Sequence, residues 1–195
     1  IGDDSDYVTI GGGRLNDIGD DSDYSAIAGG YDNDIGNYSG SATIAGGTLN
    51  KIGTNSYDAT IAGGLVNNIG NDSGSATIAG GYQNDIGDNS EHSTIPGGAN
   101  NDIGDGAPFA LAAGFSAKAN HQGAFVWADS QYADFESTAT DQFSVRSGGG
   151  ARFETGGAGM TVDGLAVFTG TDGSTFTNLN VSQIDGPFEA IGDLK

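Results

Sequence analysis

The sequence predicts an all-β fold, a parallel β-roll solenoid built from seventeen-residue coils. Isoleucine-glycine pairs recur every seventeen residues from Ile1 to Ile103, and a second series of isoleucines keeps the same step from Ile10 to Ile95. A Gly-Gly-x-x-Asn phrase repeats between the two series. Self-similarity at a fixed short period is typical of solenoids, in which each unit buries its apolar side only against its neighbours.

Composition agrees with a turn-rich β fold. The 195 residues include 36 glycines and only 3 prolines, and no Gly-X-Y period is present, which argues against a collagen helix. Short runs of Thr, Val, Ile, Tyr and Phe are bounded by Gly, Asn and Asp, a pattern typical of strands and turns. The absence of cysteine excludes disulfides and thiolate metal sites.

The first strand of each coil precedes the glycine pair. In the coil of residues 41–57, strand alternation places Ala42 and Ile44 on one side and Thr43 on the other. The glycine pair that follows is expected to turn the chain, because glycine adopts positive φ without a steric penalty.

The second strand of each coil brings another isoleucine to the same interior. Asn50 and Ile52 share one side of this strand, whereas Lys51 points to solvent. Stacking the coils then gives inward columns of identical residues. The predicted isoleucine columns are Ile18, Ile35, Ile52, Ile69 and Ile86, and Ile27, Ile44, Ile61 and Ile78. The column Asn33, Asn50, Asn67 and Asn84 is expected to form either an inward amide ladder or turns in which each side chain bonds its own backbone.

A core of two isoleucines and some alanines per coil is thin. The Ala- and Gly-rich flats beside it would be exposed on a single chain, and contiguous apolar flats usually mark an association surface. The sequence therefore predicts a homo-oligomer with cyclic symmetry that packs through these flats.

The repeated phrase Ile-Ala-Gly-Gly-x-x-Asn-x-Ile-Gly resembles the head repeats of YadA-like trimeric adhesins, and it is similar to the Gly-Gly-x-x-Asn repeats of phage tail fibres. The resemblance extends from residue 1 to about residue 128 and implies a left-handed parallel β-roll with three chains to a rod. The seventeen-residue step is longer than the usual coil of that family. The extra residues, near 55–58, are therefore expected to form a longer outer loop.

Three segments are expected along the chain. Residues 1–106 form the β-roll shaft, residues 107–155 a closing coil and β-hairpin cap, and residues 156–195 a C-terminal β neck or connector that resembles the β-prism necks of viral fibres. A solenoid needs capping at its ends. Large apolar residues that arrive together suit the cap: Phe115, Phe125, Trp127, Phe135 and Phe143.

Two details place the boundary and the cap. The seventeen-residue step breaks at Ala107, because Leu111 follows Ile95 by sixteen residues. Residues 142–147 and 151–155 flank three consecutive glycines, which predicts an antiparallel hairpin.

The charge restricts the possible partners. The formal net charge is −20, with 22 Asp, 4 Glu and 6 Lys plus Arg. An acidic rod repels phosphate backbones, so nucleic acid is not an expected partner. The longest apolar run, residues 109–115, is far too short to insert through a bilayer.

Three explanations for the aspartates stay open: turn formation, adaptation to high salt, and binding of divalent cations. The candidate Ca²⁺ ligands are Asp20, Asp21 and Asp23, although later coils do not repeat them. No other cofactor is expected.

No Ser-His-Asp spacing, phosphate loop or HExxH motif occurs in the chain. The leading hypothesis is a non-enzymatic segment of a homotrimeric fibre, extracellular or part of a virion, such as a viral tail fibre or spike. Its partners would be other fibre or virion proteins and a host surface glycan or protein in a saline environment. The alternatives are a cellular surface adhesin or extracellular filament subunit, and a polysaccharide-cleaving tailspike.

Overall fold

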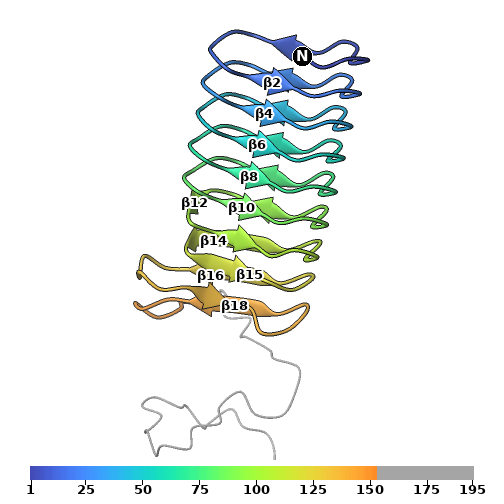
Figure 1. The fold of residues 1–195 in the computed structure, drawn as a ribbon. Coiled ribbons are helices and arrows are strands. Elements are labelled where there is room, and N and C mark those ends of the chain that lie inside the picture. The colour runs from blue at the N-terminus through green and yellow to red at the C-terminus, as the bar shows by residue number, and fades with distance from the viewer. Residues whose placement is uncertain (153–195) are drawn as a thin grey trace, which may run out of the picture. The chain divides into compact units, whose positions relative to one another are not determined.

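The computed structural model describes residues 1–152, and the expected neck at residues 156–195 lies outside the described part. The all-β class and the parallel solenoid of seventeen-residue coils are confirmed, whereas the trimer and the C-terminal cap stay predictions. Every regular element among the described residues is a β-strand, and the strands stack as a parallel solenoid of seventeen-residue coils (Figure 1). Residues 1–151 form one compact unit. Within the described residues no helix is long and apolar enough to cross a membrane.

Two parallel sheets face each other across the interior of the solenoid. Sheet A consists of β1 (Thr9–Ile10), β3 (Ala26–Ile27), β5 (Thr43–Ile44), β7 (Thr60–Ile61), β9 (Thr77–Ile78), β11 (Thr94–Ile95), β12 (Gly98–Ala99), β14 (Leu111–Phe115), β16 (Phe125–Ala128) and β18 (Phe143–Arg146). Sheet B consists of β2 (Asp17–Ile18), β4 (Asp34–Ile35), β6 (Lys51–Ile52), β8 (Asn68–Ile69), β10 (Asp85–Ile86), β13 (Asp102–Ile103), β15 (Ala117–Ala119) and β17 (Phe135–Glu136).

The register of the sheets follows the sequence period. Ile44 pairs with Ile61, seventeen residues later, and the same step holds from β1 to β11 and from β2 to β13. The glycines permit this close stacking. A Cβ on Gly53 would lie 2.6 Å from the carbonyl carbon of Gly70 in the next coil, so no larger residue fits there without displacing a coil.

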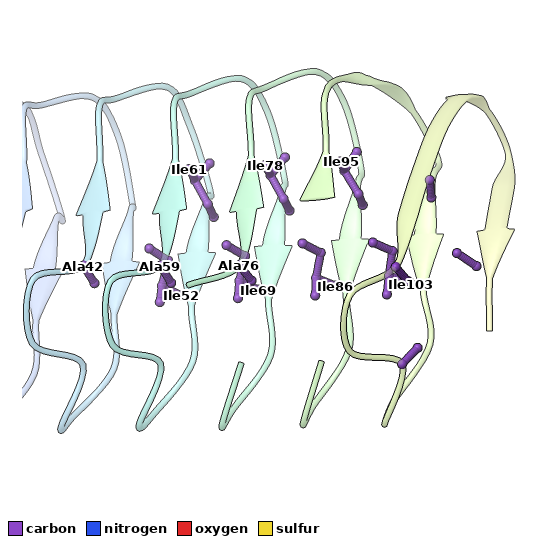
Figure 2. Close-up of a cluster of buried hydrophobic side chains, with 14 of the residues drawn as sticks. Ala42, Ile52, Ala59, Ile61, Ile69, Ala76, Ile78, Ile86, Ile95 and Ile103 are labelled. Carbon is purple, nitrogen blue, oxygen red and sulfur yellow. The ribbon is translucent and has the colours of Figure 1, made fainter. Parts of the chain in front are cut away.

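The interior holds two ladders of isoleucine, one from each sheet (Figure 2). Their side chains are fully buried, because alternation within each short strand points one residue inward and its neighbour outward. The buried isoleucines are Ile27, Ile44, Ile61, Ile78 and Ile95 from sheet A and Ile18, Ile35, Ile52, Ile69, Ile86 and Ile103 from sheet B. Ala42, Ala59 and Ala76 fill the remaining space between them.

The coils change in length after residue 106, but the parallel ladder continues to β18. Leu111 pairs with Thr94 rather than with Ile95, so it lies on the outward side, and the buried Ala112 follows it. The interior therefore loses an isoleucine at this coil. A one-residue shortening appears only afterwards, where Gly98 pairs with Gly114.

The strand expected to start a hairpin extends the solenoid instead. Phe143–Arg146 (β18) pairs in parallel with β16, in a register that joins Phe125 to Phe143. The second arm of the expected hairpin, residues 151–155, lies mostly outside the described part of the chain.

A charged clamp holds the last coils together. Arg146 Nε donates to Asp129 Oδ1 at 2.9 Å, and both side chains are largely buried. The backbone N–H of Gly148 donates to the same carboxylate, as does the Gln131 amide. The hydrogen bond from Gly148 has the largest effect on Asp129, and together these bonds lower the pKa of its carboxyl to about 2.

Candidate interaction surfaces

The side chains of the asparagine column are buried in the wall of the solenoid, and their amide groups form hydrogen bonds between coils. Asn50 Nδ2 donates to Gly46 O at 3.0 Å, to Gly64 O at 3.1 Å and to Asn33 Oδ1 at 3.1 Å. Its own Oδ1 accepts from the backbone and side chain of Asn67. Because one amide ties three successive coils, the column has no spare group for a ligand.

A second buried polar column escapes a reading of the sequence. Serine recurs every seventeen residues from Ser5 to Ser90, and from Ser22 onward it is buried. Ser39 Oγ donates to Gly53 O at 2.8 Å and accepts from the backbone N–H of Ser56 at 3.1 Å. The period was visible in the sequence, but serine is so common in turns that its burial could not be inferred.

The candidate calcium ligands Asp20, Asp21 and Asp23 lie on one loop without converging on a common point. Asp20 Oδ1 accepts from the backbone N–H of Asp3 at 2.7 Å, and Asp23 Oδ1 accepts from that of Asp6 at 2.6 Å. Nowhere in residues 1–152 do three or more His, Asp or Glu side chains group in a way that could hold a metal ion. Asp20 and Asp23 therefore link the first two coils.

The outward side of sheet B is charged. One residue of each strand forms a column along it: Asp17, Asp34, Lys51, Asn68, Asp85, Asp102, Lys118 and Glu136. The two lysines each lie 3.7 Å from the aspartate of the preceding coil, Lys51 from Asp34 and Lys118 from Asp102. This side is therefore suited to contact with water.

A polar hollow of about 330 Å³ lies on the same side, lined by Gln83, Asp85, Asn100, Asn101, Asp102 and Lys118. Its polar groups pair largely with one another. Lys118 Nζ donates to Asn100 O at 3.3 Å and Asn101 belongs to the amide column. The hollow therefore presents few free groups to a ligand.

Asp85 in this hollow gives a pH-dependent prediction. Burial, the largest influence, raises the pKa of its carboxyl above the usual value of 3.8, and the carboxylates of Asp102 and Asp105 raise it further. The folded state then binds the proton more tightly than the unfolded state does. The stabilisation by this group is complete below about pH 3.8 and is lost as the pH rises through the raised pKa.

We therefore expect Asp85→Asn to raise the thermal midpoint at pH 7 and to have little effect at pH 3.5. The asparagine oxygen can still accept the hydrogen bond from Asn68 Nδ2. Thermal unfolding followed by circular dichroism at the two pH values measures the difference. Asp58→Asn, on an exposed loop, removes the same charge and serves as control. An equal gain in both variants would mean that net charge, not burial, is the cause.

The outward side of sheet A is uncharged along the shaft. Its first column is mainly threonine, at positions 43, 60, 77 and 94. Its second column follows the inward isoleucines and consists of the exposed residues Ala28, Ala45, Ala62, Ala79 and Pro96. These small side chains leave a flat surface on which another backbone could approach closely.

The same two columns become large and apolar in the last three coils. Leu111, Phe125 and Phe143 continue the first column, and Ala113, Trp127 and Val145 continue the second. The rings of Phe125 and Phe143 stack with centroids 4.8 Å apart. Of the residues predicted to form a cap core, Trp127 is 38% and Phe143 68% exposed on this open face, whereas Phe135 in sheet B packs against the core.

A line of apolar side chains also follows the glycine turns beside sheet A. Tyr31, Leu65 and Tyr82 occupy one bridged column, and each is 41–45% exposed. Leu49 and Val66 in the next column are exposed as well, and both have positive φ. A β-branched residue such as valine is uncommon in that backbone region, where Asn or Gly is favoured.

Comparison with protein-family models finds none that matches this chain, and a search of curated proteins finds no match either.

Proposed function

We propose that this chain is a non-enzymatic structural segment of a homotrimeric fibre that attaches to a surface outside the cell. The observation that carries the proposal is the asymmetry of the solenoid. Sheet A presents an uncharged outward side along the shaft and large apolar side chains in the last three coils, whereas sheet B presents a column of charged residues. A face of this kind on a regular rod suits packing against identical rods around a common axis.

Three chains follow from the resemblance to trimeric β-roll adhesins and tail fibres. The small threonine and alanine side chains along the shaft would let neighbouring chains approach closely, and the aromatic residues of the last three coils would anchor them. Aromatic side chains in the centre of an interface supply much of its binding energy.

The acidic surface suits a saline environment, since salt screens the mutual repulsion of the carboxylates. A viral tail fibre or spike is the role that combines a trimeric rod, a high negative charge and exposed variable loops.

The oligomeric state tests the proposal directly. Sedimentation equilibrium or native mass spectrometry of the full chain should give three times the 19.5 kDa of one chain. Ala62→Asp places a charge in the middle of the sheet A face and should yield monomers that keep their β circular dichroism. Thr54→Asp adds the same charge on a loop, at a position where aspartate or asparagine occurs in most other coils, and should leave the trimer intact. A wild-type monomer at micromolar concentration would contradict the proposal.

A further inference from the structure

The loops that run from sheet B to sheet A carry stacked rings at the two ends of one column, Tyr7 with Tyr24 and His92 with Phe109. These loops span residues 2–8, 19–25, 36–42, 53–59, 70–76, 87–93 and 104–110, and we refer to them together as the loop edge. On the loop edge Tyr7 and Tyr24 stack with ring centroids 5.0 Å apart and planes within 5° of parallel. Tyr7 is 77% exposed and Tyr24 63% exposed, so the pair is not part of the core.

Folding does not account for these tyrosines. Both have φ of 60°, in the left-handed region that disfavours bulky side chains. The next three residues of the same column are Ser41, Asp58 and Ser75, which shows that small or polar residues fill this position without loss of the coil. Exposed rings kept at an unfavourable backbone position indicate a role in recognition.

The surroundings of the tyrosine pair are strongly acidic. Six aspartates lie on the same two loops: Asp3, Asp4, Asp6, Asp20, Asp21 and Asp23. Asp20 and Asp23 each use Oδ1 for a backbone hydrogen bond, which leaves Oδ2 of each carboxylate open to a further donor. The basic side chains of the described part lie elsewhere, on sheet A, on sheet B, by a glycine turn or after the last strand: Arg14, Lys51, Lys118, Arg146 and Arg152.

A small residue follows Tyr24 along the column. The next residue is the small Ser41, and the one after it is Asp58, each one coil further along at the strand spacing of about 4.8 Å. The ring of Tyr57 lies beside this position, 3.6 Å from the point that a Cβ on Gly40 would occupy. Ser41 therefore lies in the coil between Tyr24 on one side and Tyr57 and Asp58 on the other.

We propose that the loop edge of the first four coils binds an arginine-rich segment of a partner protein. A guanidinium group stacked on Tyr24 above Ser41 would lie about one coil spacing, ~4.8 Å, from Asp58, and further arginines would pair with the aspartates of the first two loops. Arginine is favoured over lysine because its planar group stacks on aromatic rings and bonds carboxylates in pairs. An anionic host glycan would be repelled by this surface.

The inference deepens the proposed attachment role, and rests on it only in taking the loop edge to face solvent in the assembled fibre. Sedimentation of the same samples distinguishes the trimeric fibre from the arginine-rich partner. If the particle keeps the mass of a trimer but does not bind the peptide, only the arginine-rich partner is refuted.

The test is isothermal titration calorimetry of the full chain with three probes: an acetylated hexa-arginine amide, the matching hexa-lysine amide and a neutral hexasaccharide. The arginine peptide should bind at least tenfold more tightly than the lysine peptide at 150 mM salt. The double variant Tyr7→Asn/Tyr24→Asn should lose at least tenfold in arginine affinity while its thermal midpoint stays level or rises, because asparagine tolerates positive φ.

Tyr132→Asn removes a tyrosine that is 93% exposed and lies outside the loop edge and outside the outward columns of sheet A, and it should leave binding unchanged. Equal affinity for arginine and lysine peptides, or an unchanged affinity in the Tyr7/Tyr24 variant, would reduce the effect to general charge attraction and overturn the proposal. If the saccharide binds and the arginine peptide does not, the ligand of the loop edge is a glycan and the proposed basic partner is wrong. If the arginine peptide does not bind at all, the proposal of an arginine-rich partner is also refuted.

Discussion

Replacing Asn67 by leucine is expected to destabilise the solenoid by roughly 3–6 kcal/mol, because each buried polar group left without a partner costs about 1–3 kcal/mol. The Asn67 amide nitrogen donates to Asn50 Oδ1, Gly63 O and Gly81 O at 3.0–3.1 Å. Its oxygen accepts from the backbone and side chain of Asn84. Leucine matches asparagine in size but offers neither donor nor acceptor, so the partners in three coils lose bonds that water cannot replace.

Urea unfolding followed by circular dichroism measures this change, and amide hydrogen exchange locates it. Exchange is needed because long repeat arrays can unfold in parts rather than in a single step. Asn68→Leu, one residue further along, is the control, since its side chain faces outward and donates only to Asp85. Similar losses in the two variants would mean that the buried amide column does not hold the coils together.

Truncating Ile61 to alanine should cost about 2–5 kcal/mol, the usual range for deleting a large aliphatic side chain from a packed core. Ile61 is fully buried and pairs in the sheet with Ile44 on one side and Ile78 on the other. With only two isoleucines and small residues in each coil, few neighbouring side chains can move to fill the cavity. Both adjacent coils should therefore lose hydrogen-exchange protection together.

Three comparisons calibrate the Ile61 result. Ile61→Val should cost only about 0.5–1.5 kcal/mol, because it removes a single methyl group. Thr60→Ala, on the outward side of the same strand, should change stability little. Ile10→Ala should cost less than Ile61→Ala, since Ile10 in the first coil is only partly buried. A loss at Ile10 equal to that at Ile61 would contradict the stacked core described above.

The shaft could be predicted closely because two independent periods act on the same residues. The seventeen-residue step fixes which residues stack, and the two-residue alternation fixes which of them face inward. Ile44 and Ile61 therefore pair as the sequence predicts, and Ala42 lies inside while Ala45 lies outside. Because every coil repeats the same arrangement, these two periods are enough to predict the shaft.

The coils after residue 106 were harder to predict because the period changes there. Leu111 looks like a core residue in the sequence, yet its backbone pairing with Thr94 turns it outward. Phe143 looks like the start of a hairpin, yet it pairs in parallel with Phe125, eighteen residues earlier. A shift of one residue in register moves a side chain to the opposite side of a strand, so an irregular step cannot be resolved without the pairing itself.

The sequence by itself determined the solenoid, its coil length and the inward columns of isoleucine and asparagine, because these follow from periodicity alone. Only the tertiary structure decided that the serine column is buried, that the last three coils present aromatic rings on an open face, and that the stacked rings of Tyr7 and Tyr24 lie exposed. In the shaft the period shows which residues of adjacent coils stack, but strand alternation does not extend into the loops and so does not show which way a loop side chain points. After residue 106 the coil lengths are irregular, so even the register is decided only in the folded chain.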